Sequence, residues 1–276
     1  MRGLAEYVMV GRRQAIIAVL LCGFFPLLYF LSAGVVGLVT MRKGPREGSL
    51  ILLWSLLPAG ALWILGDTSA TFLMLGTFVL AQVLRQTESW QLLILTAAGI
   101  GLLIQFSLVL QTGYVTEVEQ VGESLQAQLN QGTTVYTAEQ VVDLLLSFYG
   151  AYHTFWLIIC MMIARWWQAL LYNPGGFSQE FHNLRFDPKV MVILLGLILA
   201  GLLDIPPLAN WLPLLCVPPM FAGLAITHWV VGIKKLGTAW LVFTYMTLLM
   251  MPPAIILLGL SDSMLDLRKR LERPKQ

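Results

Sequence analysis

Residues 86–164 contain neither lysine nor arginine, although Arg85 and Arg165 stand at the two borders of this stretch. Within it, two long apolar runs flank an acidic segment, residues 112–137. In membrane proteins, lysine and arginine gather in the loops on the cytoplasmic side. The pattern therefore predicts two crossings of a bilayer, with both basic borders on the cytoplasmic side and residues 112–137 outside the cell.

The composition extends this interpretation to the whole chain. Hydrophobic residues make up 58% of the 276 residues and charged residues only 12%, whereas soluble domains carry about 25% charged residues. The apolar runs are too continuous for barrel strands, which alternate over about ten residues, so helices must satisfy the backbone polar groups in the bilayer. We predict an all-α fold, a polytopic helical membrane bundle formed by residues 1–276 as a single integral membrane domain. The apolar runs are residues 14–40, 49–65, 70–84, 90–111, 139–164, 190–203, 211–233 and 236–260.

The first and last runs leave the number of crossings open, so we expect about eight or nine hydrophobic segments, some of them short or re-entrant. Run 14–40 lies between two basic clusters, which favours a hairpin turning near Pro26–Tyr29. Two full crossings would need about 40 residues, so this pair would be shallow or re-entrant. In run 236–260, Pro252-Pro253 interrupt the apolar sequence between two basic segments. Either these prolines break the run into a re-entrant pair, or one earlier segment does not cross.

Three segments are expected to lie outside the bilayer core. Residues 112–137 have an amphipathic pattern typical of a helix on the extracytoplasmic side. Capping-box patterns occur at Thr116–Glu119 and at Thr137–Gln140, each of which predicts a helix start. Residues 165–189 form a cytoplasmic loop in which aromatic residues at helical spacing predict a short helix, and residues 261–276 form a basic C-terminal tail.

One helical face in run 139–164 groups several residues that can bind a ligand. Tyr149, Gly150, His153 and Trp156 are three or four residues apart, and His153 falls near the middle of the membrane. Polar side chains at this depth cost free energy unless they face protein or water, so they mark candidate sites. A histidine between aromatic residues can bind an anionic or amphipathic substrate or pass protons. The alternative is that His153 makes a structural hydrogen bond to a neighbouring helix.

Gln105 lies on a face of small residues, since Ala98 and Gly101 precede it by seven and four positions. Such a face lets two helices approach closely, and the glutamine can then form a polar bond across their interface. Further pairs of small residues four apart predict a compact bundle or self-association. They are Ala33 with Gly37, Ala97 with Gly101, and Gly196 with Ala200.

The remaining chemistry-bearing residues suggest neither catalysis nor cofactors. Asp67, Asp204 and Asp262 each stand at a membrane edge, where a helix cap or a turn is the expected role. Two of them meeting His153 around one cavity would instead indicate a cation or proton pathway. The three cysteines lie inside apolar runs, and the three histidines lack metal-binding spacing, so we expect no metal site. The sequence has no phosphate-binding loop and no G-x-S-x-G motif. We therefore expect a protein that is not an enzyme, needs no cofactor and, lacking a basic stripe, does not bind nucleic acid.

The C-terminal region resembles a known family. Gly259-Leu260-Ser261-Asp262 followed by Asp266 to Leu271 is similar to the C-terminal signature of the YybS-like family of bacterial membrane proteins. Gly223-Leu224 with His228, and the segment from Gly176 to Leu184, are further similar stretches, and the order of apolar runs corresponds over nearly the whole chain. The family has no known function, so the resemblance implies a multi-pass protein of the bacterial inner membrane and little more. The hydropathy pattern also loosely resembles the substrate-binding components of energy-coupling-factor vitamin transporters, which rely on a separate ATPase.

Two functions from different classes are compatible with these features. The first is a substrate-binding or transport-related component without its own ATPase, which works with an energy-coupling subunit or another partner membrane protein. Its candidate binding residues are Gln105, Tyr149, His153, Trp156 and Tyr245. The alternative is a membrane scaffold or assembly factor that contacts membrane lipids or a partner through its cytoplasmic loop and tail. The candidate contact residues are Phe177, Phe181, Arg268, Lys269 and Arg270.

Overall fold

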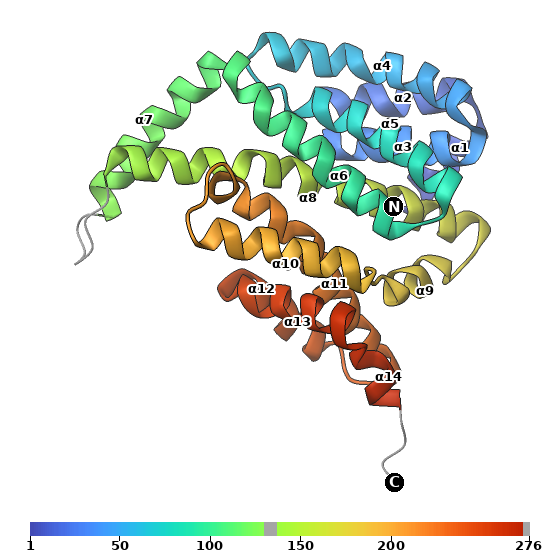
Figure 1. Cartoon of the computed structure of the whole chain (residues 1–276). Coiled ribbons are helices and arrows are strands. Elements are labelled where there is room, and N and C mark those ends of the chain that lie inside the picture. Colours follow the sequence, from blue (N-terminus) through green and yellow to red (C-terminus); the bar gives the residue numbers. More distant parts are fainter. Residues whose placement is uncertain (130–136, 273–276) are drawn as a thin grey trace. The chain divides into compact units, whose positions relative to one another are not determined.

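The computed structural model describes residues 1–129 and 137–272, which form helices and connecting turns with no strand among them (Figure 1). The all-α prediction is confirmed. The chain divides into two compact units, Met1–Pro174 and Gly175–Gln276, which we call unit 1 and unit 2 and describe separately. Residues 130–136 of the predicted amphipathic segment and residues 273–276 of the predicted tail lie outside the described residues.

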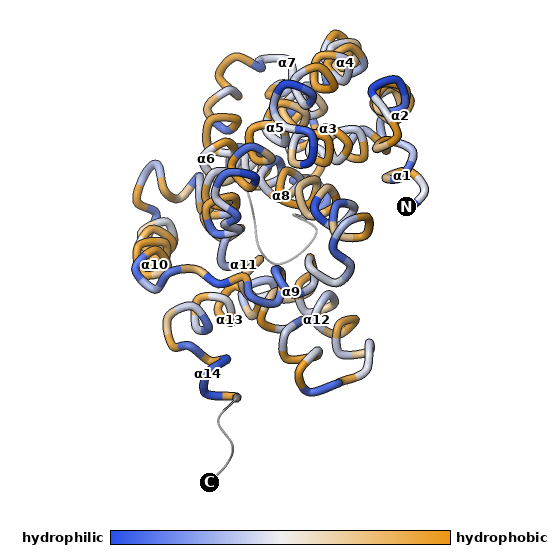
Figure 2. The backbone as a smooth tube through the Cα atoms, turned by 90° about the vertical axis from the view of Figure 1, so that its right-hand side faces the viewer, coloured by the Kyte–Doolittle hydropathy of each residue, from blue (hydrophilic) through white to orange (hydrophobic). Residues whose placement is uncertain are grey.

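Fewer helices than predicted have the length and composition of a membrane span. Among the described residues, four helices qualify, and the bent pair Ala239–Met250 and Pro252–Leu265 makes a fifth if it counts as one span. The predicted count of eight or nine is therefore not confirmed. The reason is helix length, since several apolar runs form helices of only 13 to 15 residues, shorter than the roughly 20 residues of a crossing. Figure 2 shows hydrophobic residues along the helices and hydrophilic ones mainly at helix ends and connections.

Unit 1 contains eight α-helices and one 3-10 helix in its described part. They are α1 (Arg2–Val10), α2 (Arg12–Phe24), α3 (Tyr29–Lys43), α4 (Pro45–Ile64), α5 (Ser69–Thr87), α6 (Trp90–Phe106), η1 (Ser107–Leu110), α7 (Thr112–Leu129) and α8 (Ala138–Tyr172).

The first apolar run forms the predicted hairpin. Helix α2 ends at Phe24 and α3 begins at Tyr29, so the break includes Pro26, which cannot continue a regular helix. The two helices pack against each other, and Ser32 in α3 donates a hydrogen bond of 3.1 Å from its Oγ to the carbonyl oxygen of Val19 in α2. Helix α3 then lies at the centre of unit 1, with 11 of its 15 residues buried.

Basic residues from several helices meet at one end of unit 1. Arg12 at the start of α2 forms an ion pair with Glu47 in the first turn of α4. Arg85 near the end of α5 donates a hydrogen bond of 2.9 Å to the carbonyl oxygen of Met41 near the end of α3. The guanidinium of Arg42 lies 4.1 Å from the centre of the Tyr172 ring at the end of α8. This gathering is what the charge pattern of the sequence predicts for one face of a membrane protein.

The opposite end of unit 1 contains the α4–α5 turn and helix α7. Helix α8 begins with the predicted capping box, since Thr137 and Gln140 exchange both side-chain bonds with the backbone. The other predicted cap, at Thr116–Glu119, is wrong. Helix α7 already begins at Thr112, so the Thr116 hydroxyl lies inside the helix and bonds to the carbonyl oxygen of Thr112 at 3.0 Å. Helix α7 contacts the beginning of α8, where a Cβ on Gly122 would come within 2.6 Å of Val142.

Unit 2 contains six α-helices in its described part. They are α9 (Gly176–Asn183), α10 (Pro188–Leu202), α11 (Leu208–Ile233), α12 (Ala239–Met250), α13 (Pro252–Leu265) and α14 (Leu267–Glu272). The short helix expected in the cytoplasmic loop is present as α9. The loop itself begins later than expected, because α8 continues past Arg165 to Tyr172.

The last apolar run is broken at the prolines. The chain bends by 112° between α12 and α13, at Met251. Pro252 occupies the first position of α13, where its missing N–H costs no helical hydrogen bond. Helix α13 then lies directly against α11, and Gly223 and Gly259 bring the two backbones into contact. This geometry fits the first of the two alternatives for this run, a pair of helices separated by the prolines.

Candidate functional site

A polar cluster lies at the end of unit 1 opposite the basic residues. The Thr68 hydroxyl, the Tyr149 hydroxyl and the Gln111 side chain meet from the α4–α5 turn, α8 and the α6–α7 connection. Both hydroxyls donate to Oε1 of Gln111 at 2.9 Å, and they lie 3.1 Å from each other. The Gln111 Nε2 in turn donates to the Ser107 hydroxyl at 2.8 Å. Since Thr68 and Tyr149 are buried, this network fixes the ends of several helices around one place.

Two cavities lie beside this cluster and share Tyr114 in their linings. One has a volume of about 450 Å³, and we call it the tyrosine cavity. Its lining includes Tyr29, Asp67, Tyr114, Tyr149, Tyr152 and His153. The other, of about 440 Å³, is lined by Thr68, Phe72 and Gln111 among others. Both volumes fall within the range of small-molecule sites, about 300–1,000 Å³.

Helix α7 supplies Tyr114, which lines both cavities. Its ring centre lies 4.8 Å from that of Tyr149. Burial raises the pKa of the Tyr114 hydroxyl, and the neighbouring Tyr149 adds to the effect. Tyr114 therefore stays neutral over the physiological pH range and offers an aromatic face with a hydroxyl donor.

His153 is the most deeply buried polar residue of the tyrosine cavity, with no exposed surface. Its Nδ1 lies 2.8 Å from the carbonyl oxygen of Tyr149. A carbonyl oxygen only accepts hydrogen bonds, so Nδ1 carries the hydrogen. In the neutral ring Nε2 is then an acceptor, and it has no partner among the described residues. Because a buried polar atom without a partner is costly, this nitrogen is suited to a ligand.

Aromatic rings surround His153 on its own helix and on α5. The centre of the histidine ring lies 4.5 Å from that of Tyr149, 5.2 Å from that of Tyr152 and 5.6 Å from that of Phe72. The sequence prediction that Tyr149 and His153 share a face is confirmed by these contacts. The structural alternative, a bond to a neighbouring helix, is not seen, because Nδ1 bonds to the backbone of its own helix α8 and Nε2 has no partner among the described residues.

Gln105 holds α6 against α8 and is not among the residues that line either cavity. Its Nε2 donates to the carbonyl oxygen of Leu146 at 3.0 Å, and its Oε1 accepts from the N–H of Gly150 at 2.7 Å. In an undisturbed α-helix, the Leu146 carbonyl and the Gly150 N–H would bond to each other. The glutamine amide thus bridges one step of the α8 hydrogen-bond ladder, one turn before His153.

Replacing Gln105 by leucine is expected to lower the stability of unit 1 by about 1–2 kcal/mol, because two bonds between helices are lost. Gln105→Glu keeps an acceptor for the Gly150 N–H, and a protonated glutamate can also donate to the Leu146 carbonyl oxygen. At a pH where the glutamate is protonated, this variant should therefore cost less stability than leucine. The measurement is the thermal unfolding midpoint of the purified chain in lipid nanodiscs. Equal midpoints for wild type and Gln105→Leu would show that the bridge contributes no stability.

Two other predicted binding residues lie elsewhere. Trp156 packs against Phe30 on α3 and Tyr152 on α8, with ring centres 5.7 and 6.4 Å away, and is not part of the lining of the tyrosine cavity. Tyr245 belongs to unit 2, where its hydroxyl lies 2.9 Å from Nε2 of His228. Their aromatic character marked them in the sequence, but their contacts serve helix packing in unit 1 and a hydrogen bond in unit 2.

Several lining residues of the tyrosine cavity were not expected from the sequence as binding residues, among them Tyr29, Asp67 and Tyr114. Asp67 does have the predicted turn role, since its Oδ1 accepts a hydrogen bond of 2.9 Å from the N–H of Ser69, and it also lines the cavity with Tyr29 and Tyr114. These side chains come from two helices and a turn far apart in the chain. In the sequence, the signal that could have indicated these residues is that each is polar and lies near the outer end of an apolar run.

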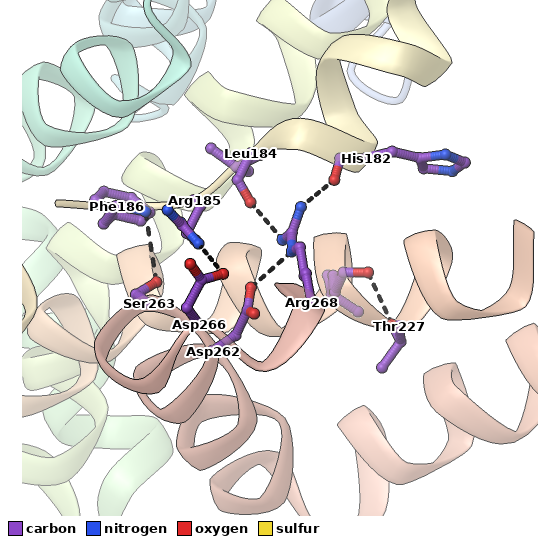
Figure 3. Close-up of polar contacts among 10 residues, drawn as sticks. His182, Leu184, Arg185, Phe186, Thr227, Asp262, Ser263, Asp266 and Arg268 are labelled. Atoms are coloured by element: carbon purple, nitrogen blue, oxygen red, sulfur yellow. Dashed lines mark hydrogen bonds and ion pairs between the residues drawn. The ribbon is translucent and has the colours of Figure 1, made fainter. Parts of the chain in front are cut away.

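Unit 2 contains a buried ion pair that the sequence analysis did not predict (Figure 3). Arg268 donates from Nε to Oδ2 of Asp262 at 2.8 Å, and from its terminal nitrogens to the carbonyl oxygens of His182 and Leu184. Asp262 has no exposed surface and Arg268 is only 9% exposed. All three guanidinium nitrogens therefore donate to groups inside unit 2. The sequence had instead predicted that Arg268 contacts lipid or a partner.

Neighbouring bonds join the same segments. Arg185 forms an ion pair of 2.5 Å with Asp266, and the backbone N–H of Phe186 donates to the Ser263 hydroxyl at 3.4 Å. Together these contacts tie the connection after α9 to the end of α13 and to α14. Asp262 therefore has a core role, in place of the predicted cap or turn.

The other predicted contact residues differ in exposure. Phe181 is buried and its ring centre lies 5.3 Å from that of His228, while Phe177 stacks on Phe181 at 6.2 Å. Burial and the charge of Arg268 lower the pKa of the adjacent His182. Lys269 and Arg270 are exposed, so a surface role for the tail depends on these two residues.

No group of three or more histidine, cysteine or acidic residues among the described residues is placed to hold a metal ion. The comparisons with known proteins add no relative, because no family model, curated protein or solved structure matches this chain.

Proposed function

We propose that this chain is a multi-pass protein of the bacterial inner membrane, of the YybS-like type, that binds a small molecule in the tyrosine cavity. In this proposal it is a substrate-binding or transport-related component, and a partner supplies the energy because the chain has no phosphate-binding loop. The observation that carries the proposal is a cavity of ligand size whose lining includes His153, a buried residue with an unpartnered Nε2. The other buried side-chain atoms without a partner among the described residues, on Thr71, Thr77, Trp167 and Asp262, belong to residues outside the lining of this cavity.

The position of the cavity supports the same proposal. It lies at the end of unit 1 where residues 86–164 supply no basic side chain, and the basic residues of α2, α3 and α5 gather at the other end. Under the positive-inside rule, the cavity then faces the extracytoplasmic side. A binding component that captures its ligand from outside the cell needs a site at that end.

The proposal is tested by native mass spectrometry of the full-length chain, purified in mild detergent from the cells that produce it. We expect a small-molecule adduct on the wild-type chain and its loss from His153→Leu, because a ligand deprived of the Nε2 bond should bind about tenfold more weakly. Trp156→Phe is the matched control, since Trp156 lies one turn further along α8 outside the cavity lining, and it should keep the adduct.

A second measurement separates loss of ligand from loss of folding. Cys160 is buried in α8, so it should stay protected from thiol reagents in a correctly folded His153→Leu chain. A wild-type chain without adduct, or an adduct that His153→Leu retains, contradicts the proposal. If the double substitution Lys269→Ala with Arg270→Ala instead abolishes lipid or partner contact, the scaffold alternative is supported.

A further inference from the structure

The tyrosine cavity has an electrostatic character that restricts its ligand. Asp67 is the only charged side chain among the described residues that line it, and no lysine or arginine contributes. The aspartate makes no ion pair with another described residue; its Oδ1 accepts the Ser69 N–H. A carboxylate without a counter-ion repels anions and attracts cations.

The aromatic side chains of the lining point to the same charge. Four tyrosines line the cavity, Tyr29 from α3, Tyr114 from α7, and Tyr149 and Tyr152 from α8. The faces of aromatic rings carry a negative quadrupole, so a group of rings attracts ammonium ions. Leu145 and Phe148 add apolar surface to the same cavity, which suits a ligand with an apolar body.

His153 adds a hydrogen-bond acceptor to this environment. Because Nδ1–H donates to the carbonyl oxygen of Tyr149, the atom of the neutral ring left for a ligand is Nε2, which is buried, so a ligand reaches it when the neighbouring rings shift. This nitrogen can accept from an ammonium N–H, whereas it cannot donate to a carboxylate or phosphate. Thus the carboxylate, the rings and the histidine all favour a cation that carries N–H groups.

We infer that the ligand of the tyrosine cavity is an organic ammonium ion with an apolar body. The inference rests on the proposed function, since it names the class of molecule that the same cavity would take. The ammonium group would lie near Asp67 and the tyrosine faces, with His153 as a neutral acceptor.

Three probes of similar size test the charge preference, namely 2-phenylethylammonium, 2-phenylethanol and phenylacetate. Binding to the full-length chain in phosphatidylcholine nanodiscs is measured by isothermal titration calorimetry, with empty nanodiscs subtracted. We expect the ammonium probe to bind at least about tenfold more tightly than the other two, a difference of about 1.4 kcal/mol.

Asp67→Asn should remove this preference while leaving binding of the alcohol unchanged. Asparagine keeps the side-chain oxygen that accepts the Ser69 N–H, so the turn is preserved. Glu123→Gln is the matched control, because it removes an exposed carboxylate of α7 that is not in the cavity lining. It should leave the preference for ammonium intact.

The inference is overturned if the alcohol or the carboxylate binds as tightly as the ammonium probe, or if Asp67→Asn keeps the preference. If His153→Leu abolishes the probe binding in either of these cases, the cavity is still the binding site and the proposed function stands. If none of the three probes binds, the ammonium class is wrong, and the adduct found by mass spectrometry decides the proposed function independently.

Discussion

Arg268→Met is expected to destabilise unit 2 by about 3–5 kcal/mol, because it leaves the buried carboxylate of Asp262 without its counter-ion. Methionine keeps much of the length and apolar volume of the arginine stem, so the change removes mainly the charge and its bonds. The carbonyl oxygens of His182 and Leu184 lose their donors at the same time. One side-chain oxygen of Asp262, Oδ1, already has no partner among the described residues, which leaves nothing nearby to compensate.

The native cysteines provide a measurement that distinguishes the units. Cys216 is the one cysteine of unit 2, whereas Cys22 lies in unit 1, and both are half-buried. Because Cys216 is only partly exposed, its labelling rate with a small maleimide should rise as unit 2 opens more often, and the thermal unfolding midpoint in nanodiscs should fall with it. Cys22 should keep its wild-type rate.

Two further variants make the result specific. Lys269→Met removes an exposed charge from the next position and should leave the Cys216 rate close to that of wild type. Combining Arg268→Met with Asp262→Asn should recover part of the lost stability, since the unpaired charge is gone. Equal labelling rates for Arg268→Met and wild type would mean that the buried pair does not hold unit 2 together.

Gly259→Ala is expected to cost unit 2 about 3 kcal/mol or more, at the upper end of the range for overpacked cores. A Cβ at this position would lie 2.0 Å from the carbonyl oxygen of Pro219 and 2.6 Å from the backbone nitrogen of Gly223. These atoms are backbone, so no side chain can rotate away, and α13 would have to move off α11. The buried residues Phe221 and Ile255 would lose contacts as a result.

The measurement is the thermal unfolding midpoint in nanodiscs, together with the Cys216 labelling rate. Gly223→Ala should act similarly, because its Cβ would lie 2.0 Å from the carbonyl oxygen of Ile255. Gly196→Ala in α10 is the control, since nothing lies within 4 Å of its Cβ, and its midpoint should match or slightly exceed that of wild type. Unchanged midpoints for both Gly259→Ala and Gly223→Ala would contradict the close approach of the two helices.

These two predictions concern residues on which the proposed YybS-like assignment depends. Gly223, Gly259, Asp262, Asp266 and Arg268 all belong to the similar stretches, and the contacts described above place them inside unit 2. Their visible role is therefore structural. A motif made of glycines at a helix contact and an internal ion pair specifies a fold. It does not specify which ligand the protein binds.

Several elements of unit 1 followed directly from local sequence patterns. The hairpin at Pro26, the capping box at Thr137–Gln140 and the shared face of Tyr149 and His153 depend on residues close together in the chain. The cap expected at Thr116–Glu119 failed although its pattern is also local, because helix α7 could begin one turn earlier. Short patterns define helix ends only when no neighbouring residue serves as well.

The number of spans and the residues of the cavity required the tertiary structure. Hydropathy marks an apolar run, but it does not tell whether a short helix crosses a bilayer or packs inside the protein, as the 15-residue helix α3 does. Asp67 and Tyr114 meet Tyr149 only because the α4–α5 turn and helix α7 lie beside α8. The sequence analysis predicted Arg268 to be a surface residue because its partner Asp262 was interpreted as a helix cap.

By itself, the sequence determined an all-helical chain rich in membrane-compatible segments, with basic side chains gathered at one end of unit 1. It could do so because hydrophobic periodicity and charge placement are properties of neighbouring residues and of the solvent each segment prefers. The tertiary structure alone decided which polar groups meet, namely Asp67 with four tyrosines and His153, and Arg268 with Asp262. The cavity depends on contacts between distant segments, and Arg268 is held inside by the carbonyl oxygens of His182 and Leu184 from a distant part of the chain, which no local pattern encodes.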